Sequence, residues 1–138
     1  MSSSESRSGI AIIQELFSWY NQLIAERRQV RREDVERFFT ADAVMIANNR
    51  VKCRGIEAHL LHFHDLSEQM QQTEIQPLDI VLSTPTRAAA YYRINFVAKN
   101  GTQGTVYDMA IWDFADGKIQ RMTEVIHVEG APVNLKDF

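Results

Sequence analysis

The sequence is poor in the features that would indicate a secreted or membrane protein. Cys53 is its only cysteine, and no apolar run approaches the length of a membrane-crossing helix. A single cysteine excludes an intramolecular disulfide, which is compatible with a reducing compartment. Residues 1–9 are polar and serine-rich, without the apolar stretch of a secretory signal. We therefore expect a cytoplasmic protein with no membrane partner.

An excess of basic charge is also absent. Fifteen Lys and Arg residues stand against 18 Asp and Glu residues, giving a net charge of −3. Four arginines fall within residues 27–32, but Glu26, Glu33 and Asp34 lie among or beside them. Ion pairs at a solvated helix junction explain this cluster better than a nucleic-acid site does. The sequence thus predicts no nucleic-acid partner.

The residues that are present suffice for one folded domain. The 138 residues are 45% hydrophobic and 24% charged, which is typical of globular proteins. A chain of this length buries about two thirds of the surface that its unfolded state exposes. Without repeats or linkers, we expect one domain over residues 10–129, a flexible N-terminal tail over residues 1–9 and a C-terminal tail over residues 130–138.

The spacing of apolar residues changes along the chain. In the first half it follows the helical period and predicts helices over residues 10–27, 32–39 and 56–71. In the second half it follows a period of two and predicts strands. Asn100-Gly101 is a pair that tight hairpin turns favour. The expected strands cover residues 43–47, 50–53, 75–83, 88–99, 102–115 and 118–129.

This order of elements predicts an α+β fold. Helices followed by long antiparallel hairpins pack as helices on one face of a mainly antiparallel sheet. Strands of about ten residues or more exceed the usual five or six, and strands that long must twist and curl. The three helices would then cover the concave face of a curved sheet and leave a cavity for a small ligand.

Three segments resemble a known family. Residues 38–44 (FFTADAV), 55–58 (GIEA) and 114–119 (FADGKI) resemble motifs of the nuclear transport factor two-like superfamily, in the same order and spacing. The resemblance covers residues 10–128. It is strongest to the polyketide-cyclase-like (SnoaL-like) and ketosteroid-isomerase-like branches. It implies a cone-shaped half-barrel and, because the superfamily includes both enzymes and binding modules, no single activity.

The resemblance to ketosteroid isomerases concerns three site positions. Those enzymes carry a tyrosine in the first helix, an aspartate base in the first strand and a protonated aspartic acid in a later strand. Tyr20 matches the tyrosine. Ala47 and Ala110 fall at the two acid positions, and a methyl group can neither take nor give a proton. The isomerase mechanism does not transfer unchanged.

Side chains alternate between the two faces of a strand, and this alternation along the last two predicted strands indicates other acids as candidate catalytic residues. If Trp112 faces the cavity, Asp108 shares that face and is the first candidate base, unless it is an exposed residue at a strand end. Counting from the last hairpin places Glu124 inside as the second candidate, or as an ion-pair partner of an arginine such as Arg93. A β-bulge would exchange Glu124 for His127.

Histidines in the third predicted helix are further candidates. His59 falls on the apolar face and is a candidate proton donor, although a core histidine is the common alternative. His62 falls on the flank, and His64 lies nearer to solvent. A metal shared by His59 and His62 lacks a matching ligand pattern in the strands, so we expect neither metal nor cofactor.

These candidates lead to two main hypotheses. The first is a cyclase- or isomerase-like enzyme acting on an apolar carbonyl compound, with Asp108 or Glu124 as base and with Tyr20 and His59 as donors. The second is a non-catalytic binding or regulatory module for a small apolar ligand, and a scaffold is the third possibility. The expected ligand-binding residues are Trp19, Phe63, Trp112 and Met122, with His127 if the bulge is present.

A homodimer is also expected. The face of the sheet that points away from the helices carries several apolar residues, and exposed apolar patches usually mark interfaces. Such pairs are normally related by a two-fold axis. The residues concerned are Tyr107, Met109, Ile111 and Val125.

Overall fold

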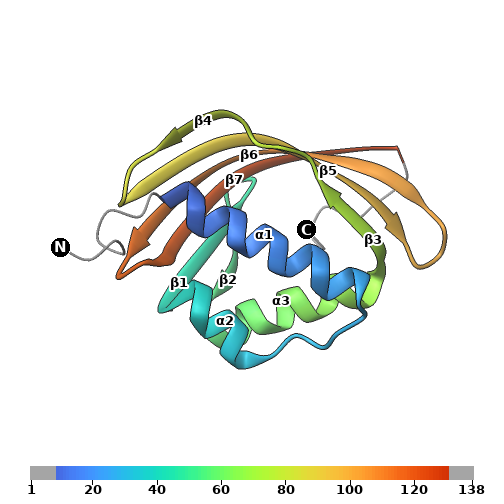
Figure 1. Cartoon of the computed structure of the whole chain (residues 1–138), viewed down its shortest axis with the longest axis horizontal. Coiled ribbons are helices and arrows are strands. Elements are labelled where there is room, and N and C mark those ends of the chain that lie inside the picture. The colour runs from blue at the N-terminus through green and yellow to red at the C-terminus, as the bar shows by residue number, and fades with distance from the viewer. Residues whose placement is uncertain (1–8, 131–138) are drawn as a thin grey trace.

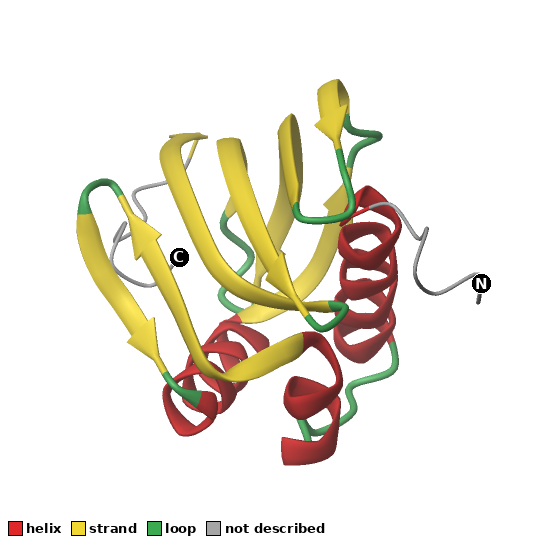
Figure 2. Ribbon diagram, turned by 90° about the vertical axis from the view of Figure 1, so that its left-hand side faces the viewer, coloured by secondary structure: helices red, strands yellow, loops and turns green. Residues whose placement is uncertain are grey.

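A strongly curved sheet wraps over three helices (Figures 1 and 2). The computed structural model describes residues 9–130. The helices are α1 (Gly9–Ala25), α2 (Arg32–Phe38) and α3 (Ile56–Gln69), and they lie on the concave side of the sheet. None of the helices in this part of the chain combines the length and the apolar character that crossing a bilayer requires.

The sheet is mainly antiparallel. Within the described residues it has seven strands, in the order β2-β1-β7-β6-β5-β3, and β4 pairs with β5 beside this path. Only the pairing of β1 with β7 is parallel among these strands. This architecture confirms the predicted α+β fold. The strands are β1 (Phe39–Ala47), β2 (Arg50–Arg54), β3 (Met70–Ile75), β4 (Asp79–Ser83), β5 (Arg87–Ala98), β6 (Gln103–Ala115) and β7 (Lys118–Gly130).

The strand predicted over residues 75–83 is present only in part: β4 covers residues 79–83, and Ile75 is the last residue of β3. β3 pairs with the C-terminal half of β5, whereas β4 pairs with its N-terminal half. Pro77 lies between them and has no N–H to donate to a neighbouring strand. α3 also ends two residues earlier than predicted, and β3 follows it directly from Met70.

The ends of the described chain extend slightly past the predicted domain. α1 begins at Gly9 and β7 ends at Gly130. A Cβ atom at Gly9 would lie only 2.3 Å from the ring of Phe114, so a larger residue here would have to displace that buried ring. Residues 1–8 and 131–138 of the predicted tails lie outside the described residues.

Alternation along β6 and β7 decides which side chains face the helices. In β6, Asp108, Ala110 and Trp112 are buried, while the residues between them are exposed. The pairing of β6 with β7 shifts register at Gln120, which has no partner in β6, before β7 reaches the cavity. From that point Glu124 faces inward. A bulge is thus present, but it leaves Glu124 facing inward and His127 exposed, so the expectation that a bulge would turn His127 inward is wrong.

Asn48 extends the parallel pairing of β1 with β7 beyond the end of β1. Its backbone N–H donates to the Glu124 carbonyl at 2.9 Å. Its side-chain Oδ1 accepts from the Ile126 N–H at 2.9 Å, and its Nδ2 donates to the Ile126 carbonyl at 3.4 Å. The backbone φ of Asn48 is +50°, a conformation that asparagine tolerates better than most residues. Asn48 thus holds the segment of β7 that carries Glu124.

We predict that Asn48→Gly lowers the free energy of unfolding by about 1–2 kcal/mol, because both side-chain hydrogen bonds to Ile126 are lost. Glycine keeps the positive φ without strain. Asn49→Gly is the matched control: Asn49 has φ +67° in the same turn, and no side-chain hydrogen bond of Asn49 occurs within residues 9–130. Urea unfolding measures both variants. Equal losses in the two variants would contradict the role of the Asn48 side chain.

Candidate functional site

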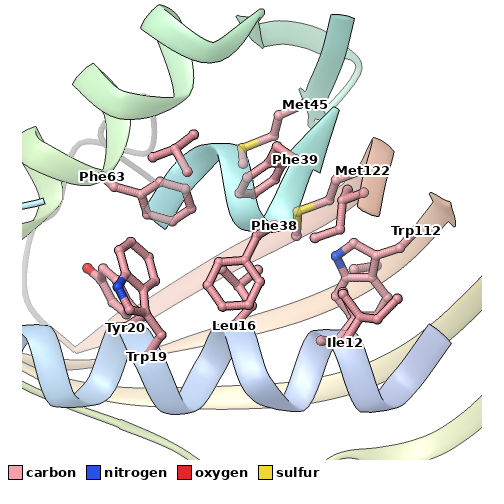
Figure 3. Close-up of a cluster of buried hydrophobic side chains, with 14 of the residues drawn as sticks. Ile12, Leu16, Trp19, Tyr20, Phe38, Phe39, Met45, Phe63, Trp112 and Met122 are labelled. Atoms are coloured by element: carbon pink, nitrogen blue, oxygen red, sulfur yellow. The ribbon is translucent and has the colours of Figure 1, made fainter. Parts of the chain in front are cut away.

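A largely apolar cavity of about 100 Å³ lies between α1, α3 and the concave face of the sheet. Phe63, Trp112 and Met122, which the sequence predicts as ligand-binding residues, all line it and are labelled in Figure 3. Wider hollows elsewhere, such as one of about 460 Å³ lined by residues of β3, β5 and β6, are open to solvent. The cavity has room for about three water molecules or for one compact group of a ligand. Its polar lining side chains are Tyr20, His62, Tyr92, Asp108 and Glu124.

Two carboxyl groups meet this cavity from adjacent strands. Asp108 and Glu124 are each only 4% exposed. Asp108 stands opposite Ile126 in the register, so Glu124 is its diagonal neighbour, within reach of a long side chain. The Tyr92 hydroxyl donates to Asp108 Oδ2 at 2.8 Å, whereas Asp108 Oδ1 has no donor among the described residues. Oδ1 can accept a hydrogen bond from Glu124 when the Glu124 carboxyl is protonated.

Burial controls the ionisation of both carboxyl groups. It raises the pKa of Asp108 to about 6, although hydrogen bonds with Glu124 and Tyr92 and the charge of Lys52 act in the opposite direction. Burial also raises the pKa of Glu124 well above its ordinary value, and the negative charge of Asp108 raises it further. Two neighbouring carboxyl groups of this kind titrate as a pair. Around neutral pH, we infer that they share one proton.

The two tyrosines of the cavity supply neutral hydroxyl groups. Burial raises the pKa of Tyr20 and that of Tyr92 above the ordinary value of a phenol. Both therefore stay protonated at neutral pH and can donate. The Tyr92 proton is already directed at Asp108. Tyr20 packs against the rings of Trp19 and Phe63, and no hydrogen bond to its hydroxyl is found within residues 9–130.

His62, rather than His59, lines the cavity. His59 is 1% exposed, its Nδ1 donates to the Gly55 carbonyl at 2.7 Å, and its ring packs against Phe39. The expectation that His59 faces the ligand is thus corrected: α3 meets the cavity one turn later, through His62 and Phe63. Burial, followed by the charge of Lys52, lowers the pKa of His62 to about 3, so its imidazole is neutral.

Two other predicted ligand-binding residues lie away from the cavity. Trp19 is buried, but its ring packs against Phe38 and Phe63 outside the cavity lining. His127 is exposed on the outer face, where its Nε2 lies 3.4 Å from Glu129. The bulge at Gln120 decides that His127 faces outward. It lies before the cavity-facing part of β7, so the alternation after it places Met122 and Glu124 inside.

The two alanines at the isomerase acid positions differ in location. Ala110 is buried on the inward face of β6, between Asp108 and Trp112 in sequence. Ala47 is half-buried at the end of β1 and packs against the core. Neither carries a titratable group, so the site's carboxyl groups stand at different positions from those of the isomerases.

Sequence reasoning missed Tyr92 and His62. Tyr92 faces Asp108 directly across β5 and β6. Alternation along β5 could have placed it inward once this register was known. To predict that His62 lines the cavity, one must know where α3 lies relative to the cavity, and helical periodicity alone does not give this.

The residues offer little for thiol or metal chemistry. Cys53 is buried, and burial raises the pKa of its thiol to about 11, which disfavours a nucleophilic thiolate. Within residues 9–130, no three His, Cys, Asp or Glu side chains gather in a way that could hold a metal ion. Proton transfer by the carboxyl pair is the chemistry that the arrangement supports.

Comparisons with known proteins agree with this fold. The model of the SnoaL-like domain family matches residues 18–122. An NTF2-like protein from Anabaena variabilis has a similar structure, with a TM-score of 0.71 and 18% identity over 94% of this chain and 95% of that one. A proposed SnoaL-like polyketide cyclase from Jannaschia sp. gives a TM-score of 0.64 and 16% identity over 86% and 84% of the two chains.

A proposed isomerase from Rhodopseudomonas palustris gives a TM-score of 0.68 and 12% identity over 83% of this chain and 88% of that one. No curated protein sequence matches this chain. At these identities, the structural similarities show a common fold and leave the activity to be argued from the site.

Proposed function

We propose that this chain, which belongs to the SnoaL-like domain family, is an acid–base enzyme of the cyclase or isomerase kind that acts on an apolar carbonyl compound without a cofactor. One observation carries the proposal: Asp108 and Glu124 are buried side by side at an apolar cavity, with Tyr92 hydrogen-bonded to Asp108. A buried carboxyl with a pKa raised toward neutrality is suited to general acid–base catalysis.

The hydrogen bond from Tyr92 assigns roles within the pair. A hydrogen bond donated to a carboxylate favours its charged form, so Asp108 is the base and Glu124 holds the shared proton. Asp108 removes a proton from the carbon next to the substrate carbonyl, and the electron pair of the broken C–H bond moves into an enolate. In an isomerisation, the proton returns to a different carbon. In a cyclisation, the enolate carbon attacks a second carbonyl of the same molecule, and the new alkoxide takes the proton.

Both versions of the reaction balance without an added oxidant, reductant or metal. The apolar wall keeps water away from the enolate, which strengthens each hydrogen bond made to it. The structural neighbours described as a cyclase and an isomerase support this reaction class. The small volume of the cavity favours a compact reacting group, with the lining side chains moving apart for a larger substrate.

The direct test is exchange of deuterium from heavy water into the carbons next to the carbonyl of cyclopentanone, followed by NMR. We predict that the wild-type protein accelerates this exchange and that Asp108→Asn slows it by about 100-fold or more, the typical contribution of a general base. The rate should rise as the pH passes the Asp108 pKa of about 6, because the carboxylate is the active form.

Asp113→Asn is the matched control for this experiment. Asp113 lies on the same strand as Asp108, but its carboxylate pairs with Arg87 at 2.6 Å on the surface. This variant should exchange at the wild-type rate. A wild-type rate equal to that of buffer, or an unchanged rate in Asp108→Asn, would contradict the enzyme proposal.

The alternative function is a non-catalytic binding or regulatory module for a small apolar ligand. The alanines at both isomerase acid positions, Ala47 and Ala110, favour it. Binding of cyclopentanone without any deuterium exchange would support this alternative, because it needs the apolar cavity and not the base.

The outer face of the sheet supports a homodimer as the form in which the site operates. Met109 and Val125 are 60% and 66% exposed, and they stand directly opposite one another on β6 and β7. Ile111 extends the same apolar surface. A second copy of this face, related by a two-fold axis, would cover it.

We predict a mass of about 32 kDa by light scattering, twice the 15.9 kDa of one chain. Met109→Lys should shift the protein to the monomer mass, because it places a charge within the apolar surface. Leu61→Lys, at an exposed leucine of α3, is the control and should stay dimeric. A wild-type mass near 16 kDa at micromolar concentration would refute the dimer.

A further inference from the structure

We propose that Trp112 is a catalytic residue of this site, whose indole N–H binds the carbonyl oxygen of the substrate. This inference rests on the proposed function and deepens it, because it identifies the donor that stabilises the enolate oxygen. The substrate it implies is a neutral carbonyl compound with an acidic C–H next to the carbonyl. Of the two donors that the resemblance to isomerases implies, Tyr20 is retained, but Ala110 stands where their protonated acid would be.

The indole nitrogen of Trp112 is buried without an acceptor. Trp112 is 0% exposed, and its Nε1 has no hydrogen-bond partner among the described residues. An indole N–H can only donate, and burying it without an acceptor is unfavourable. Buried groups of this kind are rare in native proteins and call for an explanation such as a bound ligand. Figure 3 shows this nitrogen turned toward the interior, on the side of Met122.

Trp112 and the proposed base belong to the same cavity wall. Trp112 and Asp108 line the cavity from one face of β6, with Ala110 between them. Ala110 itself is buried and does not line the cavity. Tyr92 contacts both residues. Its ring stacks on the Trp112 ring with centroids 6.1 Å apart, and its hydroxyl donates a hydrogen bond to Asp108.

This wall presents one donor without a partner, the Trp112 N–H, and beside it the carboxylate of Asp108, whose Oδ1 can accept from the protonated Glu124. A carbonyl compound fits this wall, because its oxygen accepts from Trp112 while the C–H beside the carbonyl faces Asp108. A hydrocarbon of the same shape would leave the Trp112 N–H without an acceptor. The pattern therefore favours carbonyl compounds over purely apolar ligands.

The surrounding rings hold the indole in place. Phe17 packs edge-on against Trp112, with centroids 6.3 Å apart and an interplanar angle of 70°, while Tyr92 stacks on it. A donor held in position before the reaction needs no reorganisation as charge develops on the substrate oxygen, which makes it effective. Figure 3 places the Tyr20 hydroxyl at the opposite end of the cluster, turned away from Trp112.

Trp19 provides an internal control. It is the other of the two tryptophans of this chain, and its Nε1 is likewise buried without a partner among the described residues. It does not line the cavity. A ligand in the cavity should therefore change the environment of the Trp112 N–H and leave that of Trp19 unchanged.

The first experiment observes the two indole N–H signals of ¹⁵N-labelled protein by NMR, assigned with Trp112→Phe and Trp19→Phe. Cyclopentanone should move the Trp112 signal downfield, as hydrogen bonding does, and leave the Trp19 signal in place. Methylenecyclopentane, which has the same shape without the oxygen, should not produce the downfield shift. The methyl signal of Met122 reports whether each probe occupies the cavity.

Two results of this experiment overturn the proposal. One is an unmoved Trp112 signal when the Met122 methyl shows that cyclopentanone is bound. The other is the absence of any shift in either signal up to the solubility limit of cyclopentanone.

The second experiment separates this inference from the proposed function. Trp112→Phe should lower kcat for deuterium exchange by about 100-fold, typical for the loss of one oxyanion donor, with a smaller change in KM. Trp19→Phe should retain the wild-type kcat. Normal exchange by Trp112→Phe overturns the role of Trp112 while the enzyme proposal stands. A downfield shift of Trp112 in a protein without exchange activity overturns both catalytic roles.

Discussion

Asp108 and Glu124 lie out of water on adjacent strands, and both cannot be ionised there without a large electrostatic cost. This constraint determines the chemistry of the cavity. One shared proton makes the pair a base and an acid at the same time, and the Tyr92 hydrogen bond selects Asp108 as the charged member. The other polar groups are consistent with this arrangement, because Tyr20 stays protonated and His62 stays neutral.

The fold creates the pair through the curvature and register of the sheet. The bulge at Gln120 in β7 places Glu124 on the same side of the sheet as Asp108. Asn48 then fixes that part of β7 by continuing the parallel pairing through its side chain. The three helices close the concave face over the carboxyl groups, and their aromatic side chains exclude water. A carboxyl pair on a flat, open sheet would be solvated and would keep ordinary pKa values.

Much of this fold could be predicted from the sequence, because helix periodicity and strand alternation are local. Alternation alone placed Asp108 on the face of Trp112. The orientation of Glu124 was ambiguous, because the position of a bulge depends on how β7 pairs with β6. Tyr92 was missed because its proximity to Asp108 is a matter of register between strands. His62 was missed because the cavity lies one turn beyond His59 along α3. Each of these errors concerns how elements distant in the sequence lie relative to one another, and a local sequence pattern carries no information on that.

The central claim is that the buried carboxyl groups share a proton. Its most direct test is an NMR titration of the carboxyl carbons in protein labelled with ¹³C at Asp and Glu, with Asp108→Asn and Glu124→Gln assigning the two signals. The account predicts that Asp108 titrates at about pH 6 rather than at the ordinary 3.8, and that Glu124 loses its proton at higher pH than an ordinary glutamate. Titration of both signals at the values of exposed carboxyl groups would contradict it.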